Sequence, residues 1–343
     1  MNIYDFLTTD NFRYWMEFIP KNREEYQKIT QIAYNFKLNT KIPTTVHIEP
    51  TNYCNQKCYM CCHPDMKRKK QQIDEKIAFK AIDECAALGV YATHFFFFGE
   101  PFINKNTIEY MGYAKKKKIP LVSTTTNFTL VSDSDIEKLI DYQIDSIHVS
   151  FEGLNKERYK NIRGTDDFDT VKNNLMKLIR LKEEKKSLKP WIALTYVRTN
   201  ETDDEIYRFI HEWNKKVNDI HISPQFDYLG RAPIRKYQKD VNSERILDRS
   251  EENRLPCRQL WLRLVVLSNG ELVPCSQNID GEVSIGNLNN TSIIEAWNSN
   301  NMLELRMSHL SNRIVNPVCK KCIDWDWSGK VDNRPQLMSA LKK

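Results

Sequence analysis

The sequence predicts an α/β fold of about six consecutive strand–helix units, followed by a smaller C-terminal region. Short runs rich in β-branched and aromatic residues alternate with longer segments whose apolar residues recur at helical spacing, which is typical of a parallel sheet or barrel. The 343 residues are enough for one barrel with an appendage, and 41% hydrophobic with 28% charged residues excludes wholesale disorder. Glycine is scarce, with only 10 residues, and neither a dinucleotide-binding nor a P-loop motif occurs.

The strand–helix alternation assigns each element of the predicted barrel in order. The segments expected to form strands are 45–48, 93–98, 120–125, 145–151, 191–197 and 219–226. The helices expected between them are 73–88, 106–117, 134–142, 168–181 and 203–213. Residues 95–98 are four consecutive phenylalanines without alternation, so this strand is expected to be buried on both faces.

The chain is expected to divide into four parts. Residues 1–43 carry many aromatic side chains and are expected to be helices packed on the barrel, which itself spans 44–230. Residues 231–256 are charged and weakly periodic, and are interpreted as a bridge. From 257 to 343 we expect a second domain with a β-hairpin of 262–267 and 271–274 around Asn269-Gly270, and a helix over 293–307.

Charge and hydropathy limit the cellular setting. The formal net charge of +6 is too small to imply nucleic-acid binding by itself. No run approaches the length of about 18 apolar residues that a membrane span needs, and the N-terminus does not resemble a signal peptide. A cytoplasmic protein with no membrane or nucleic-acid partner is therefore expected. Its nine cysteines then stay reduced, which favours metal ligation or catalysis over disulfides.

Three of these cysteines follow the first predicted strand. Cys54, Cys58 and Cys61 form a C-x3-C-x2-C pattern. Three thiolates on one tight loop can hold three corners of a cubane [4Fe–4S] cluster and leave one iron open. The alternative is a structural zinc loop, which needs a closed set of four ligands, and the nearest extra ligands are Cys62 and His63.

This cysteine loop resembles that of the radical S-adenosylmethionine (radical SAM) enzymes. Further motifs at the ends of successive strands are similar to the family's GGEP, TNG and S-[LIF]-[DE]-G segments and to its downstream arginine element. They are Phe98-Gly99-Glu100-Pro101, Thr125-Thr126-Asn127, Ser150-Phe151-Glu152-Gly153 and Asn161-Ile162-Arg163-Gly164. The resemblance implies a partial (β/α)6 TIM-like barrel, whose active site lies at the C-terminal ends of the strands.

The resemblance also implies which residues bind S-adenosylmethionine. Gly99, Glu100 and Pro101 are expected to hold its amino group, and Arg163 its methionine carboxylate. Met60 stands where the family usually has the aromatic residue that contacts adenine. The other expected contacts are Asn127, Ser150 and Glu152.

A second group of four cysteines lies in the C-terminal region. Four thiolates make a fully ligated site, which on ligand chemistry suits zinc and a [4Fe–4S] cluster equally. The spacing resembles the SPASM/Twitch region attached to many radical SAM proteins, and four cysteines imply one auxiliary [4Fe–4S] cluster of the Twitch type or of a reduced SPASM type. Full ligation implies an electron-transfer or structural role. The four are Cys257, Cys275, Cys319 and Cys322.

The two remaining thiols are interpreted differently from each other. Cys85 lies on an apolar helical face and is expected to be buried and inert. Cys62, next to the cluster loop, is a candidate hydrogen-atom donor of the kind used by radical SAM epimerases, against the simpler interpretation that it packs. Polar residues near the ends of the fifth and sixth strands are candidates to face the pocket or to be ordinary barrel residues. These are Tyr196, Arg198, Gln225 and Asp227.

Together these features predict an enzyme with two [4Fe–4S] clusters that reductively cleaves S-adenosylmethionine to a 5′-deoxyadenosyl radical and abstracts a substrate hydrogen. The first choice is a dehydrogenase or other oxidoreductase of a sugar, aminocyclitol or related metabolite, supplied with electrons by a flavodoxin- or ferredoxin-like donor. The alternatives are a peptide maturase that cross-links or epimerises its substrate, and a carbohydrate epimerase. The interpretation in which the chain is not an enzyme is a zinc-binding interaction module.

Overall fold

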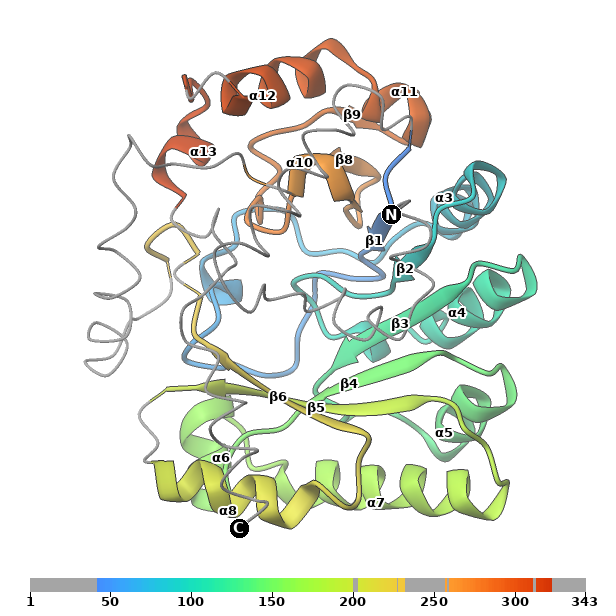
Figure 1. Cartoon of the computed structure of the whole chain (residues 1–343), viewed down its shortest axis with the longest axis vertical. Helices are drawn as coiled ribbons and strands as arrows, with labels where there is room; N and C mark the ends of the chain where they lie inside the picture. The colour runs from blue at the N-terminus through green and yellow to red at the C-terminus, as the bar shows by residue number, and fades with distance from the viewer. Residues whose placement is uncertain are drawn as a thin grey trace.

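Six parallel strands form the first part of the sheet in the computed structural model, which describes residues 42–199, 203–226, 228–231, 257, 259–310 and 313–322. Each strand pairs with its neighbour in chain order, as expected for repeated strand–helix units (Figure 1). Among the described residues the sheet does not close, so the partial barrel is confirmed. The strands are β1 (Thr45–Ile48), β2 (Ala92–His94), β3 (Leu121–Thr126), β4 (Ser146–Ser150), β5 (Trp191–Arg198) and β6 (Asp219–Pro224).

Five helices cover the outer face of these strands and match the five predicted from apolar spacing. Outward strand residues such as Val46, Val122 and Leu194 are fully buried in one core with the helices. Local sequence sets the helix ends: Ser132 and Asp135 form a capping box at the start of α5. The helices are α3 (Glu75–Leu88), α4 (Thr107–Lys116), α5 (Asp133–Asp141), α7 (Phe168–Glu184) and α8 (Asp203–Trp213).

A further helix, α6 (Lys156–Arg163), was not expected from the sequence. The Asn155 side chain caps its start, and Gly164 ends it with a φ of 74°. A Cβ atom at Gly164 would lie 2.8 Å from the Lys57 carbonyl oxygen, so glycine is required where the helix meets the cysteine loop. Helix α6 therefore ends directly against the segment that carries the predicted cluster ligands.

The inner face of the sheet is polar, because side chains alternate along each strand. His47 on β1 and His94 on β2 are buried there with ring centroids 4.8 Å apart, and His94 bonds to the Ser123 hydroxyl on β3. Burial lowers the pKa of both imidazoles well below the usual value, so they are neutral. The barrel interior beneath the strand ends is thus uncharged at these positions.

Strand β2 is shorter than predicted. The sequence predicted a strand through residue 98 buried on both faces, but β2 ends at His94, and of the four phenylalanines only Phe95 is fully buried. Beyond it the chain turns toward the cysteine loop, where the N–H of Glu100 donates to the Tyr53 carbonyl at 2.8 Å. Phe96, Phe97 and Phe98 are half-buried because they line a pocket.

The C-terminal β-hairpin continues the same sheet. Strand β7 (Arg263–Val266) pairs in parallel with β1 and antiparallel with β8 (Glu271–Val273), which pairs with the short β9 (Gly286–Asn287). The predicted hairpin is confirmed, with Gly270 at a φ of 80° in its turn. The strand order is β6-β5-β4-β3-β2-β1-β7-β8-β9, so the C-terminal region is hydrogen-bonded to the barrel through β1.

The single helix predicted over 293–307 is two helices in the structure. They are α11 (Ile293–Trp297) and α12 (Asn300–Leu310), at the top of Figure 1. Ser299 interrupts the helix because its hydroxyl accepts from the Met302 N–H at 3.2 Å, which caps the start of α12. Four further short helical elements occur in the described part of the chain: α10 (Gln259–Leu262), α13 (Pro317–Lys321) and the 3-10 helices η3 (His63–Asp65) and η4 (Pro101–Ile103).

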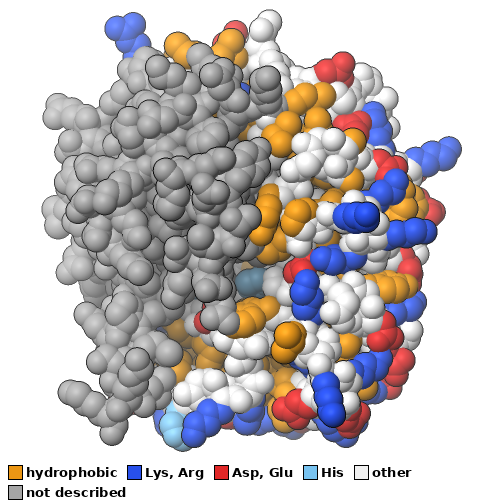
Figure 2. All heavy atoms as spheres, turned by 45° about the vertical axis from the view of Figure 1, so that its right-hand side comes forward, with side chains coloured by type: hydrophobic (Ala, Val, Ile, Leu, Met, Phe, Trp, Pro, Cys, Tyr) orange, Lys and Arg blue, Asp and Glu red, His pale blue; other side chains and the backbone are white. Residues whose placement is uncertain are grey.

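The surface of the barrel carries interspersed charges of both signs (Figure 2). Many are paired between neighbouring helices, such as Lys138 with Glu109 at 2.7 Å. None of the helices described has the length and apolar character needed to cross a bilayer. Most of the predicted N-terminal helices and of the predicted bridge, namely residues 1–41 and 232–256, lies outside the described residues.

Candidate functional site

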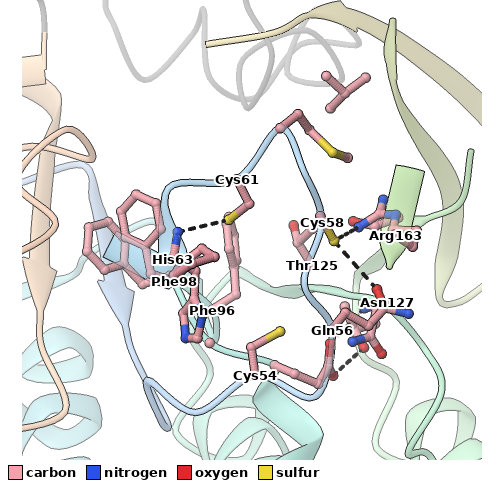
Figure 3. Close-up of a pocket in the computed structure, with 18 of the residues that line it drawn as sticks. Cys54, Gln56, Cys58, Cys61, His63, Phe96, Phe98, Thr125, Asn127 and Arg163 are labelled. Carbon is pink, nitrogen blue, oxygen red and sulfur yellow. Dashed lines mark hydrogen bonds between the residues drawn. The ribbon is translucent and has the colours of Figure 1, made fainter. Parts of the chain in front are cut away.

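The loop after β1 brings three thiols to one cavity at the C-terminal ends of the strands. Cys54, Cys58 and Cys61 all line this pocket, and Figure 3 shows their sulfur atoms directed toward it. The end of α6 holds the loop, because the N–H groups of Lys57 and Tyr59 donate to carbonyl groups of α6 at 3.2 and 3.1 Å. All three are free thiols. Three soft donors on one side of an open cavity fit a cubane cluster with an accessible iron.

The protein environment sets the protonation of these thiols. Burial raises the pKa of Cys54 to about 12 and also raises that of Cys58, which the Arg163 guanidinium opposes. A hydrogen bond from the Cys62 thiol lowers the pKa of Cys61 to about 7. Coordination to iron removes the protons from such thiols outright, so ligation is coupled to proton release.

Glu100 is a buried carboxylate that joins two of the predicted motifs. Its Oε1 accepts from the Thr126 hydroxyl at 2.6 Å and its Oε2 from the Asn127 N–H at 2.7 Å. Burial raises the pKa of Glu100 to about 7 against these hydrogen bonds. The preceding Gly99 is required, because a Cβ there would lie 2.1 Å from the Thr51 carbonyl oxygen. These contacts fix the ends of β2 and β3 against the cysteine loop.

A buried ion pair joins the other two predicted motifs, residues 150–153 and residues 161–164. Arg163 forms an ion pair with Glu152, with exposed side-chain fractions of 9% and 0%. The Val197 N–H donates to Glu152 at 3.2 Å, and an Arg163 Nη1–H donates to the Cys58 sulfur at 3.5 Å (Figure 3). The pair therefore links β4, β5 and α6 to one of the three thiols.

The pocket has a cavity volume of about 250 Å³. That volume is close to the lower end of the range of small-molecule sites. Of the predicted S-adenosylmethionine contacts, those that line it are Met60, Gly99, Glu100, Asn127, Ser150 and Arg163. Pro101 and Glu152 are buried behind the lining.

Sequence reasoning missed an aromatic wall of this pocket. Phe96, Phe97, Phe98, Phe226 and Tyr228 all line it, and the ring centroids of Phe98 and Tyr228 lie 5.6 Å apart. The phenylalanine run was visible but was interpreted as a buried strand. Gln225 does line the pocket, whereas Tyr196 packs in the core against Phe209 with ring centroids 4.8 Å apart. Asp227 lies outside the described residues.

Cys62 and Cys85 are both fully buried. Cys85 packs in the main core on α3, as expected. Cys62 packs against Met66 and Ile279 and does not line the pocket. Burial and its hydrogen bond with Cys61 raise its pKa. Hydrogen donation by Cys62 stays a prediction, and its packing gives that role no support.

Cys275 interacts electrostatically with two of the other C-terminal cysteines. Burial raises the pKa of Cys275, and the charges of the Cys319 and Cys257 thiols raise it further. Asn316 caps α13 by accepting from the N–H groups of Val318 and Cys319, at 3.0 and 3.3 Å. Helix α13 thereby presents Cys319 from its middle and Cys322 from its end. This all-thiolate set fits a fully ligated cluster.

Two family models match separate parts of the chain. Residues 48–212 match the radical SAM superfamily, and residues 257–323 match SPASM, an iron-sulfur cluster-binding domain. The first family model therefore covers most of the strand–helix units and the first cysteine loop. The second family model spans all four C-terminal cysteines.

The individual proteins that this chain resembles share only a modest fraction of its sequence. A GTP 3',8-cyclase of Clostridium botulinum is 28% identical over 218 residues, which are 60% of this chain and 64% of that protein. The tungsten-containing aldehyde ferredoxin oxidoreductase cofactor-modifying protein of Pyrococcus furiosus is 21% identical over 319 residues, covering 81% of this chain and 86% of that protein. The chain thus spans less than two thirds of the cyclase.

The fold is also found among solved structures. Streptococcus suis SuiB bound to its precursor peptide SuiA superposes with a TM-score of 0.64 at 18% identity, covering 89% of this chain and 75% of SuiB. An identity this low supports a common fold and not a common substrate. The two family models show that this chain belongs to the radical SAM superfamily and carries a C-terminal SPASM domain.

Proposed function

We propose that this chain is a radical SAM oxidoreductase that removes a hydrogen atom from a sugar, an aminocyclitol or a related small metabolite. A radical SAM enzyme with a SPASM domain uses [4Fe–4S] clusters and S-adenosylmethionine. Cys54, Cys58 and Cys61 are proposed to ligate the first cluster, and the convergence of these thiols on one open cavity carries the proposal. When bound there, the reduced cluster and S-adenosylmethionine supply a 5′-deoxyadenosyl radical.

The chain's own residues position the cofactor and exclude water. Asn127, Ser150 and Arg163 present polar groups to the cavity from the ends of β3 and β4 and from α6. Met60 is almost fully buried at the same wall, where it offers an apolar contact to a purine ring. The aromatic wall keeps the remaining space apolar, which protects a reactive carbon-centred species from solvent.

The charge of the lining argues against a polyanionic substrate. Among the described residues that line the pocket, Glu100 is the carboxylic acid and Arg163 the guanidinium, and protein partners engage both. His63 also lines it, but burial lowers its pKa, which favours the neutral imidazole. A triphosphate such as that of GTP needs several unpaired cations. Aromatic faces with neutral donors and acceptors suit a sugar ring instead.

The four C-terminal cysteines are proposed to ligate the auxiliary cluster. Full ligation would leave such a cluster no iron for substrate, so it would serve to take up the electron of the substrate radical, which makes a two-electron oxidation the proposed net reaction. The electron donor of the first cluster is proposed to be a flavodoxin- or ferredoxin-like protein.

Cofactor cleavage is the first test. Anaerobically reconstituted protein should contain about eight iron atoms from two cubanes. Addition of dithionite and S-adenosylmethionine should then release 5′-deoxyadenosine. Colourless protein that carries zinc would contradict the proposal, and so would cofactor cleavage that survives Cys58→Ala.

Substrate class is tested by isotope transfer. Perdeuterated sugars and aminocyclitols are incubated with the enzyme, and 5′-deoxyadenosine is analysed by mass spectrometry for deuterium. Transfer from one of these compounds supports the proposal. Transfer from deuterated GTP, or from a peptide encoded beside this gene, would replace the proposed substrate class while leaving the radical chemistry in place.

A further inference from the structure

A buried arginine fixes the segment that follows the first cysteine loop. Arg68 donates from Nη1 and Nη2 to the two carboxylate oxygens of Glu49, each at 2.8 Å. The exposed fractions of the two side chains are only 7% and 0%. Its Nε also donates to the carbonyl oxygen of Ile279 at 2.6 Å. A two-pronged pair of this kind restricts geometry strongly, because both partners must stay aligned.

Asp280 holds the same segment from the auxiliary region. Its Oδ1 accepts from the backbone N–H groups of Lys67 and Arg68 at 2.7 and 3.2 Å, and its Oδ2 accepts from Arg231 Nη1 at 2.7 Å. The Asp280 side chain is 7% exposed. Asp280 lies shortly after Cys275 in sequence, and Lys67 and Arg68 lie shortly after Cys61. The two cysteine regions therefore meet through one carboxylate.

An apolar contact accompanies these hydrogen bonds. Ile279 packs with Cys62 and Met66, and this cluster touches Phe98 and Tyr228. The last two residues line the pocket. A shift of the segment around Ile279 would thus move both the residue next to Cys61 and part of the aromatic wall.

We infer that Glu49, Arg68, Asp280 and Arg231 form a clasp through which the auxiliary region positions the first cysteine loop for S-adenosylmethionine. The inference rests on the proposed function, because it takes the cofactor to bind at that loop. Assembly of the auxiliary site orders Asp280, which holds the segment after Cys61 in place. Because coupling between two sites is reciprocal, cofactor binding also stabilises the auxiliary site.

The first experiment measures cofactor binding directly. In the anaerobically reconstituted full chain, Asp280→Ala should weaken S-adenosylmethionine binding about tenfold in equilibrium dialysis, since a lost buried hydrogen-bonded charge has an effect of that size. It should also alter the change that the cofactor causes in the electron paramagnetic resonance spectrum of the reduced first cluster. Asp280→Asn keeps an acceptor for the two backbone N–H groups and should restore most of the affinity.

A matched control comes from the other carboxylate that binds Arg231. Arg231 Nη2 donates to Glu282 at 2.7 Å, and the Asp280 backbone N–H donates to Glu282 at 3.3 Å. Within the part of the chain that the structure describes, Glu282 forms no hydrogen bond or ion pair with the segment after Cys61, and it leaves the Asp280 carboxylate in place. Glu282→Ala should therefore bind the cofactor like the wild type. Wild-type affinity and spectrum in Asp280→Ala, or equal losses in both variants, would overturn the inference.

The second experiment tests whether the two sites communicate through the clasp. Cys319→Ala should weaken cofactor binding in the wild type but add little in the Asp280→Ala background, whereas additive losses would refute the coupling. If the Asp280→Ala protein does not assemble its clusters, Arg68→Lys takes its place, because lysine cannot form the two-pronged pair with Glu49. Unchanged cofactor binding in Arg68→Lys would count against the clasp. Wild-type protein that binds no S-adenosylmethionine would instead refute the proposed function.

Discussion

The two cysteine regions use the same ligand chemistry in opposite surroundings. Cys54, Cys58 and Cys61 lie on one loop that borders a pocket. Cys257, Cys275 and the pair on α13 come from separate parts of the chain. The first set leaves room for a further ligand, whereas the second supplies four thiols of its own. The number of thiols and the access of the site therefore distinguish a reactive centre from a closed one.

The surroundings differ as well. Beside the first set lies the buried ion pair of Glu152 and Arg163, which reaches the Cys58 sulfur. Beside the second set, the His309 imidazole accepts from the Cys257 N–H at 3.2 Å, and the buried Arg306 guanidinium lies 4.4 Å from the Trp297 ring. A catalytic site needs charged groups held in place, and the protein stabilises them through buried pairs.

The strongest way to break this comparison is to remove one thiol of the open site. Cys58→Ala should abolish release of 5′-deoxyadenosine and lower the iron content from about eight atoms to about four, because three ligands are the minimum for the open cluster. Chromatography of the reaction and an iron assay measure both. Cys85→Ala, in the buried core of α3, is the control and should change neither value.

Removal of one thiol of the closed site should have a different result. Cys319→Ala should also lower the iron content to about four atoms. Cleavage of S-adenosylmethionine with dithionite should persist, although cofactor affinity falls because the auxiliary site no longer acts through the clasp. Oxidation of the substrate should be lost. Complete loss of 5′-deoxyadenosine at saturating cofactor would show that the two regions are not distinct in role.

The charged surroundings of the open site are tested by Glu152→Gln. This change leaves the Arg163 guanidinium buried without its anion, so the free energy of unfolding should fall by about 3 kcal/mol. Urea unfolding measures the loss. The exposed pair of Asp141 and Lys185 gives the control, since Asp141→Asn should cost less than about 1 kcal/mol. Equal losses in the two variants would contradict the proposed importance of the buried pair.

The last test concerns the titration of Glu100. Burial raises its pKa from 4.5 to about 7, so the folded protein binds this proton more tightly than the unfolded chain. Stability contributed by the group is therefore full below pH 4.5 and falls as the pH rises to about 7, by at most about 1.4 kcal/mol per pH unit. Unfolding of the wild type and Glu100→Gln between pH 5.5 and 7.5 should diverge accordingly. Parallel curves would show that Glu100 does not titrate there.

Much of the fold followed from local patterns. The alternation of strands and helices predicted β1 without error in its bounds and β3 to β6 nearly so, because buried strands and amphipathic helices leave a periodic pattern, whereas β2 is much shorter than predicted. The run of four phenylalanines misled because apolar residues without alternation look alike in a buried strand and in a pocket wall. Helix α6 was missed because its sequence, KERYKNIR, is polar over most of its length.

The candidate site was predictable only in part. The cysteine spacings, Glu100 and Arg163 were visible because each lies in a short motif. Gln225 was one of several candidates of equal standing, and only the folded chain, which brings this residue after the end of β6 to the cavity, decided that it lines the pocket. Tyr196 on β5 packs in the core, whereas the next residue, Val197, lines the pocket, because neighbouring positions on a strand alternate between faces.

The sequence by itself determined the class of chemistry: a set of three thiols on one loop, a set of four farther on, and the strand ends that surround the first. The tertiary structure alone decided which groups meet. The contact between the N–H of Lys67 and Asp280 joins residues 213 positions apart, and the pairing of β7 with β1 adds the C-terminal hairpin to the barrel sheet. Such contacts leave no local pattern, because they arise only when the folded chain brings distant segments together and buries their charges in common.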